Sequence, residues 1–168
     1  MDTKKLTLYT TRGALIGALY VVLTLLASLF GLSNGVIQFR ISEALCILPI
    51  FFPEAVPGLF IGCLISNLMV PGAVVWDIIF GSVATLIGAI GARLLASWLT
   101  HKLMWVATIP TILANVIIVP FILIYAYGSP DSYGFIALTV GIGEIVCAGV
   151  GGSALYYVLK KYEKSWLK

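Results

Sequence analysis

Six side chains capable of strong polar interactions lie within, or at the ends of, long apolar stretches of the sequence. They are Arg40, Glu43, Asn67, Asp77, Asn115 and Glu144. Carboxylates accept hydrogen bonds, a guanidinium donates them and amides do both, so this set suits the binding of a small polar molecule. Trp76, Tyr125 and Tyr127 could supply aromatic walls. The excess of carboxylates favours a ligand that is rich in N–H donors or positively charged.

Each of these residues also has a structural alternative. Asp77 could cap a helix, Arg40 and Glu43 could form a local ion pair, and Asn67 could bond to a neighbouring helix. Glu144 could be hydrogen-bonded to a hydroxyl or to the backbone. The sequence leaves these alternatives open.

The sequence carries no recognisable catalytic or metal-binding signature. It lacks His-Glu-x-x-His, Gly-x-Ser-x-Gly and a Walker lysine. His101 is the only histidine, and the three cysteines, Cys46, Cys63 and Cys147, lie inside apolar stretches as expected for packed free thiols. We therefore expect no enzyme, no catalytic residue, no bound metal and no cofactor.

The composition identifies lipid as the solvent for most of the surface. The 168 residues are 61% apolar and only 10% charged, and the mean hydropathy is +1.09. So few ionisable groups could not cover a fold of this size in water. Nucleic-acid binding is not expected, because the basic residues lie at segment ends and in the tails and do not form a stripe.

Apolar length and chain breaks predict an all-α, polytopic membrane protein that forms a single domain over residues 1–168. An apolar helix needs about 20 residues to cross the hydrocarbon core, or fewer where it lies partly in protein. A polar turn at 33–35 follows the first helix, and Pro53 and Pro57 separate the second from the third. Six transmembrane helices are expected, roughly over 13–32, 41–52, 55–69, 77–99, 105–127 and 134–159.

Charge fixes the expected orientation of these six helices. Nine of the ten basic residues fall on the side that holds both termini, and only Arg40 falls on the other. Basic residues favour the cytoplasmic side, so both termini are expected to be cytoplasmic. Glu144 then lies about 15 Å from the outer end of its helix, close to mid-depth. A carboxylate there is costly, and no basic residue is expected near enough to neutralise it, which favours a functional role.

Small residues on three helices predict close helix packing. Those of the helices at 77–99 and 134–159 are expected to pack inside the bundle. In the first helix they gather between Gly13 and Ala18, and Ala14 and Ala18 stand one turn apart. This notch could dock a partner helix or pack internally, and the sequence does not decide between the two.

Several of these residues form a recognisable pattern. It comprises the segment Phe39-Arg40-Ile41-Ser42-Glu43-Ala44-Leu45, then Leu48-Pro49, Asn67, Asp77, Gly81, Ala84-Thr85 and Gly143-Glu144. This pattern resembles the QueT family of substrate-binding S-components of energy-coupling factor (ECF) transporters. The Ala14-x-x-x-Ala18 notch also resembles the motif through which S-components dock.

The resemblance implies uptake of a queuosine precursor across a bacterial plasma membrane. The ligand would be a 7-deazaguanine, such as its 7-aminomethyl form, or queuine. An energising transmembrane subunit would dock at Ala14 and Ala18, and two cytoplasmic ATPase subunits would drive transport. Glu144 would then accept adjacent N–H donors of a guanine-type edge.

Asp77 or Glu43 would hold an aminomethyl cation, Arg40 and Asn67 would serve the ring carbonyl and nitrogens, and aromatic side chains would stack on the ring. Two alternatives remain. One is an S-component for another vitamin or nucleobase. The other is a small non-transport membrane protein whose polar residues serve only helix packing.

Overall fold

The computed structural model describes residues 2–32 and 38–166. The regular secondary structure assigned in these ranges is entirely helical. The turn expected at 33–35 lies outside the described residues. In chain order the elements are α1 (Thr3–Leu29), the 3-10 helix η1 (Ile41–Ile50), α2 (Ala55–Met69), α3 (Val75–Ala96), the 3-10 helix η2 (His101–Thr108), α4 (Ile109–Tyr125), α5 (Tyr133–Glu144), the π-helix η3 (Ile145–Gly151) and α6 (Gly152–Trp166). The predicted all-α class is confirmed.

Four helical stretches are long and apolar enough to cross a membrane. They are Thr3–Leu29, Val75–Ala96, Leu103–Tyr125 and Tyr133–Tyr162. The apolar helices Ile41–Ile50 and Ala55–Met69 are shorter. The exact number of spans and the side on which the termini lie therefore stay predictions.

Three of the predicted helix boundaries need correction. The first helix begins at Thr3 rather than near 13, because Asp2 caps it by accepting a hydrogen bond from the Lys4 amide. The segment expected as a helix over 41–52 is a 3-10 helix that ends at Ile50 and contains Pro49, which has no amide hydrogen to donate. The last helix, expected over 134–159, is divided by the π-helical turns of η3.

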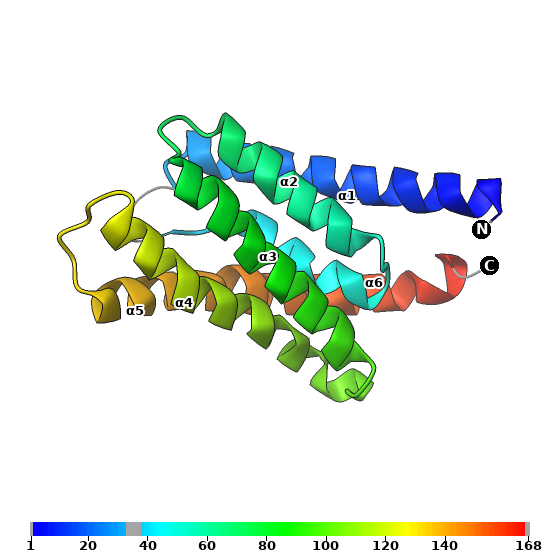
Figure 1. The fold of residues 1–168 in the computed structure, drawn as a ribbon. Coiled ribbons are helices and arrows are strands. Elements are labelled where there is room, and N and C mark those ends of the chain that lie inside the picture. Colours follow the sequence, from blue (N-terminus) through cyan, green and yellow to red (C-terminus); the bar gives the residue numbers. More distant parts are fainter. Residues whose placement is uncertain (1, 33–37, 167–168) are drawn as a thin grey trace.

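Neighbouring helices in the chain are also neighbours in space. α1 packs on α2, α2 on α3, α3 on α4 and α4 on α5, while η1 contacts α1, α3, α6 and η3 (Figure 1). The short η1 is thus surrounded by longer helices. Both ends of the chain lie at the same end of the bundle (Figure 1).

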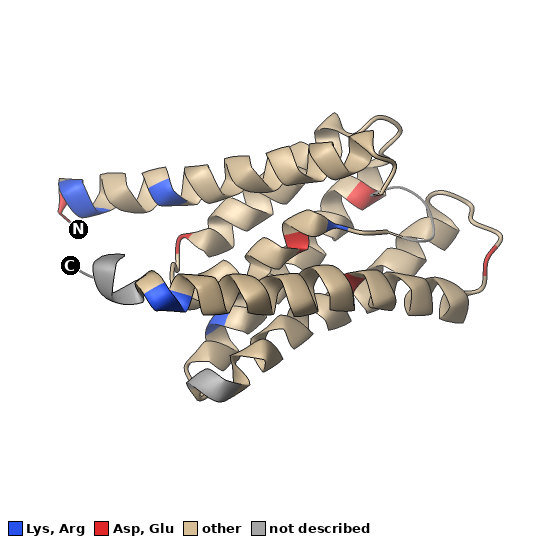
Figure 2. Cartoon of the chain, turned by 180° about the vertical axis from the view of Figure 1, so that it is seen from behind, with Lys and Arg blue, Asp and Glu red and all other residues tan. Residues whose placement is uncertain are grey.

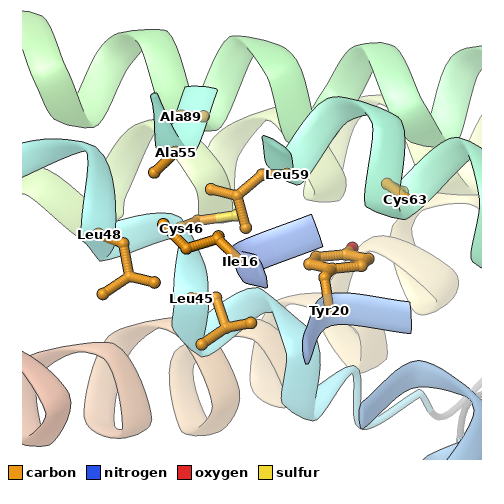
Figure 3. Close-up of a cluster of buried hydrophobic side chains, with 9 residues drawn as sticks. All are labelled: Ile16, Tyr20, Leu45, Cys46, Leu48, Ala55, Leu59, Cys63 and Ala89. Carbon is orange, nitrogen blue, oxygen red and sulfur yellow. The ribbon is translucent and has the colours of Figure 1, made fainter. Parts of the chain in front are cut away.

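The principal apolar core forms where η1 meets α1, α2 and α3. Figure 3 shows its buried side chains, which are Ile16, Tyr20, Leu45, Cys46, Leu48, Ala55, Leu59, Cys63 and Ala89. Many large apolar side chains elsewhere are exposed, among them Leu15, Leu68 and Leu138. A small core beneath an apolar exterior is the pattern expected of a chain that contacts lipid.

Glycines allow α1 and α2 to approach closely. A Cβ atom at Gly17 would lie 2.7 Å from the carbonyl oxygen of Gly58, and one at Gly62 would lie 2.7 Å from that of Gly17. Gly13 packs on Gly58 in the same way. The glycines of the α1 notch are therefore used inside the bundle, as small residues are in other membrane helix pairs.

Candidate ligand-binding site

Glu43 lies at the centre of a buried network in which both of its oxygens are engaged. Its side chain is fully buried, and Tyr20 Oη and Thr85 Oγ1 donate to Oε1 at 2.5 and 3.1 Å. Cys46 Sγ donates to Oε2 at 3.1 Å. Arg40 Nε lies 3.7 Å from Oε1, so the expected local ion pair is present. These four partners satisfy both oxygens of Glu43.

Three polar side chains from three elements converge on Gly81 of α3. A Cβ atom at Gly81 would meet Asn67 Nδ2 at 3.0 Å, Asp77 Oδ1 at 3.2 Å and Arg40 Nη1 at 3.9 Å. Asn67 comes from α2, Asp77 from α3 and Arg40 from the residue before η1. The missing side chain of Gly81 therefore lets an amide and a carboxylate approach α3 closely, with a guanidinium beside them.

The structural alternatives for Asn67 and Asp77 have different outcomes. Asn67 Nδ2 lies 3.4 Å from the backbone oxygen of Asp77, so Asn67 does bond to the neighbouring helix. Asp77 is not the N-cap of α3: Val74 occupies that position, and no side chain caps the helix there. The Asp77 carboxylate is instead held by Tyr127, whose hydroxyl donates to Oδ2 at 3.0 Å.

Tyr127 lies beyond the end of α4 and links Asp77 to the start of α3. Its hydroxyl also accepts a hydrogen bond of 3.2 Å from the Val74 amide. Burial raises the pKa of the Tyr127 phenol, and the nearby Asp77 carboxylate adds to the rise. The phenol therefore remains a donor to Asp77 at neutral pH.

A second polar group lies where α5 ends and η3 begins. Glu144 is 3% exposed and Asn115 of α4 is fully buried. Asn115 Nδ2 donates to the Thr111 carbonyl at 3.2 Å. Within the described part of the chain, Glu144 Oε2, Asn115 Oδ1 and Thr111 Oγ1 are buried without any hydrogen-bond partner.

Such unpaired atoms cost about 1–3 kcal/mol each when buried. Asn115 Oδ1 can only accept hydrogen bonds, and so can Glu144 Oε2 when the carboxyl group is ionised. A ligand that presents N–H donors would satisfy both. The π-helix that starts immediately after Glu144 is a further feature that often marks functional positions.

The two polar groups are electrostatically connected. Glu43 and Arg40 both act on Glu144, and Asp77 acts on Arg40. Among the described residues the ion pairs join Arg40 to Glu43 and Arg12 to Glu54, so no basic residue pairs with Glu144, as expected. One guanidinium nevertheless faces three carboxyl groups, so the acidic excess expected from the sequence is present in space.

The structure does not bring Trp76 and Tyr125 to this polar centre. Their side chains are 58% and 81% exposed, and with Phe80 and Phe121 they line a separate apolar hollow of about 380 Å³ between α3 and α4. Tyr127 is the aromatic residue of the expected set that touches a polar site residue, through its bond to Asp77.

Comparison with known proteins identifies the family of this chain. The sequence profile described as QueT transporter matches residues 10–161. The chain belongs to the QueT transporter family. Over 75 residues it is 40% identical to a protein of Lactococcus lactis subsp. cremoris (strain MG1363) named queuosine precursor transporter QueT.

That similarity covers 44% of this chain and 43% of the relative, so the chain matches less than half of the relative's length. No solved structure matches. Family membership confirms the resemblance read from the sequence, and it makes this QueT family member a relative of transporters rather than of enzymes.

Sequence reasoning did not assign Tyr20, Cys63 or Thr85 of this QueT family member to the site, although Thr85 belongs to the pattern that carries the resemblance. Cys63 Sγ lies within 3.5 Å of donors on Arg40, Asn67 and Thr85, so it joins the Glu43 network to the residues around Gly81. Tyr20 offered one signal, because a phenol in the middle of an apolar helix needs a partner when it is buried.

Ala14 and Ala18 lie away from the polar centre of this QueT family member. Both are exposed, and they line a hollow of about 430 Å³ along α1 and α2 that also includes Pro57 and Ile61. The glycines of the notch pack on α2, and Gly13 and Gly17 also line this hollow beside the exposed alanines.

Proposed function

We propose that this chain is the substrate-binding S-component of an ECF transporter that imports a queuosine precursor. The ligand is a 7-deazaguanine, such as its 7-aminomethyl form, or queuine. The observation that carries the proposal is the pair of buried, unpaired acceptors Glu144 Oε2 and Asn115 Oδ1, together with the polar side chains that converge on Gly81. The family and the printed name of the relative support it.

Recognition follows from the donors that such a ring presents. Glu144 Oε2 and Asn115 Oδ1 accept the adjacent N–H groups of a guanine-type edge. Arg40 and Asn67 serve the ring carbonyl and ring nitrogens. The geometry favours Asp77 over Glu43 for the aminomethyl cation, because three donors and the Arg40 guanidinium already surround Glu43.

Stacking needs an aromatic side chain near the carboxylates. Tyr127 replaces Trp76 and Tyr125 in this role, since Tyr127 contacts Asp77 and the other two line the separate apolar hollow.

Transport requires partners, because the S-component captures ligand and does not hydrolyse ATP. Six crossings with cytoplasmic termini would open the polar centre to the outer side. Most Lys and Arg lie toward the end that holds both termini, which supports that orientation (Figure 2). The energising subunit docks on the hollow at Ala14 and Ala18, and two ATPase subunits bind to that subunit in the cytoplasm.

The deciding experiment identifies the ligand directly. The protein is purified in detergent, and mass spectrometry is applied to the small molecules released on denaturation. Calorimetry then compares 7-aminomethyl-7-deazaguanine and queuine with guanine and an unrelated vitamin. We expect a 7-deazaguanine to co-purify and to bind best. Best binding of another vitamin or nucleobase would reassign the ligand, and saturable binding of none would favour a non-transport membrane protein.

A further inference from the structure

Another hollow, of about 480 Å³, is lined by residues from the C-terminal part of α3, from α6, from η2 and from the end of η1. Its lining includes two basic side chains, Arg93 of α3 and Lys160 of α6, and the polar groups of Ser97 and Tyr156. No residue described as lining it is acidic. The described lining of the hollow therefore presents two cationic side chains.

Arg93 is held at this position by the backbone. Its Nη1 atom donates to the carbonyls of Pro49 and Ile50, at 3.3 and 3.1 Å, where η1 ends. A guanidinium has five N–H donors in a fixed planar arrangement, so it can bond to these carbonyls and still bind an anion. Lys160 adds a second cation from the facing helix.

An exposed apolar stripe leads away from the hollow along α3. Ile87, Ile90 and Leu94 are spaced by three and four residues, lie on one helix face and are 48%, 42% and 62% exposed. Leu94 also lines the hollow. Beyond the end of α3, Trp98 is 87% exposed, as expected of an aromatic side chain at a membrane interface.

We propose that this hollow binds the phosphate of an anionic phospholipid. The phosphodiester would sit between Arg93 and Lys160, and an acyl chain would lie along Ile87, Ile90 and Leu94. The recognised chemistry is a phosphate anion. A lipid is favoured over free phosphate because the apolar stripe continues directly from the basic hollow. This site is independent of the proposed transport ligand.

The test uses native mass spectrometry of the purified full chain with phosphatidylglycerol or phosphatidylcholine added. We expect preferential retention of phosphatidylglycerol, weakened about tenfold by Arg93→Gln and by Lys160→Gln. Lys161→Gln is the matched control, because Lys161 is the adjacent basic residue but does not line the hollow. If loss of the Arg93 hydrogen bonds to Pro49 and Ile50 disturbs η1, Lys160→Gln still tests whether the hollow binds the lipid phosphate.

Three results would overturn the proposal. Equal retention of phosphatidylcholine would show that the negative charge is not recognised. An equal loss in Lys161→Gln would show attraction to the basic surface in general. If millimolar inorganic phosphate displaced the bound phosphatidylglycerol and phosphatidylcholine did not, the hollow would be a site for free phosphate.

Discussion

Glu43 and Glu144 are both buried carboxylates, but their surroundings give them different roles. Tyr20, Cys46 and Thr85 donate to Glu43, whereas one oxygen of Glu144 has no partner among the described residues. A buried acceptor without a donor is unfavourable in the empty protein. We therefore expect Glu43 to stabilise the fold and Glu144 to contribute to ligand affinity.

Replacing Glu144 by glutamine should weaken ligand binding. The substitution keeps the shape but removes the charge and one acceptor, and a hydrogen bond to a charged group contributes about 1.5–3 kcal/mol. We expect the Kd measured by calorimetry to rise about tenfold to a hundredfold. Asp131→Asn, which removes a charge in the loop between α4 and α5, is the control and should leave the Kd unchanged. Wild-type affinity in Glu144→Gln would refute the assigned role.

Gly81→Ala tests whether ligand binding depends on the close approach of Asn67 and Asp77 to α3. The added methyl would press on Asn67 Nδ2 at 3.0 Å and Asp77 Oδ1 at 3.2 Å. Alanine is also a better helix former than glycine by about 1 kcal/mol, so thermal stability should be kept while the Kd rises about tenfold or more. Gly134→Ala is the matched control, because nothing lies within 4 Å of a Cβ atom there. Equal affinity in both variants would exclude Gly81 from the site.

At the scale of the elements, apolar length was enough to locate the helical segments. The breaks at Pro53 and Pro57 and the length of each apolar stretch depend on the local sequence alone. The 3-10 form of η1 and the π form of η3 could not be anticipated, because they depend on how these two segments pack against each other. A run of apolar residues does not show whether a helix is α, 3-10 or π, because these helices differ little in the number of residues per turn.

The candidate site was predicted only in part for a related reason. Buried ionisable groups such as Glu144 are conspicuous in an apolar sequence. The partners of these groups are not, because Tyr20, Cys63 and Thr85 meet Glu43 and Arg40 only when four separate elements come together. Trp76 and Tyr125 were misleading because position along a helix does not determine the face on which a side chain lies.

The packing of α1 against α2 can be tested by placing the same side chain at neighbouring positions. Gly17→Val would drive its side chain into the Gly58 backbone, whereas Ala18→Val would add atoms on the exposed face. Overpacking typically costs about 1–3 kcal/mol, so only Gly17→Val should lower the melting temperature in detergent. An equal fall in both variants would mean that α1 is not held against α2 in this register.

At the scale of the whole molecule, the proposed ligand site and the proposed docking surface occupy different regions. The polar side chains around Gly81 and Glu144 are buried between helices, whereas Ala14 and Ala18 line an exposed hollow on α1 and α2. A substitution at one region should therefore leave the other intact. This separation distinguishes the proposed S-component from a protein that needs no energising subunit.

Ala14→Trp should abolish uptake by the assembled transporter and leave ligand binding by the isolated chain intact. The indole would fill the exposed hollow and prevent close approach of a partner helix, while the α1–α2 contact depends on Gly13 and Gly17. We expect cellular uptake to fall to background, with a Kd within about twofold of wild type, as for other exposed substitutions. Ala14→Ser, which keeps the side chain small, should transport normally. Loss of ligand binding in Ala14→Trp would indicate misfolding, and normal uptake would place the docking surface elsewhere.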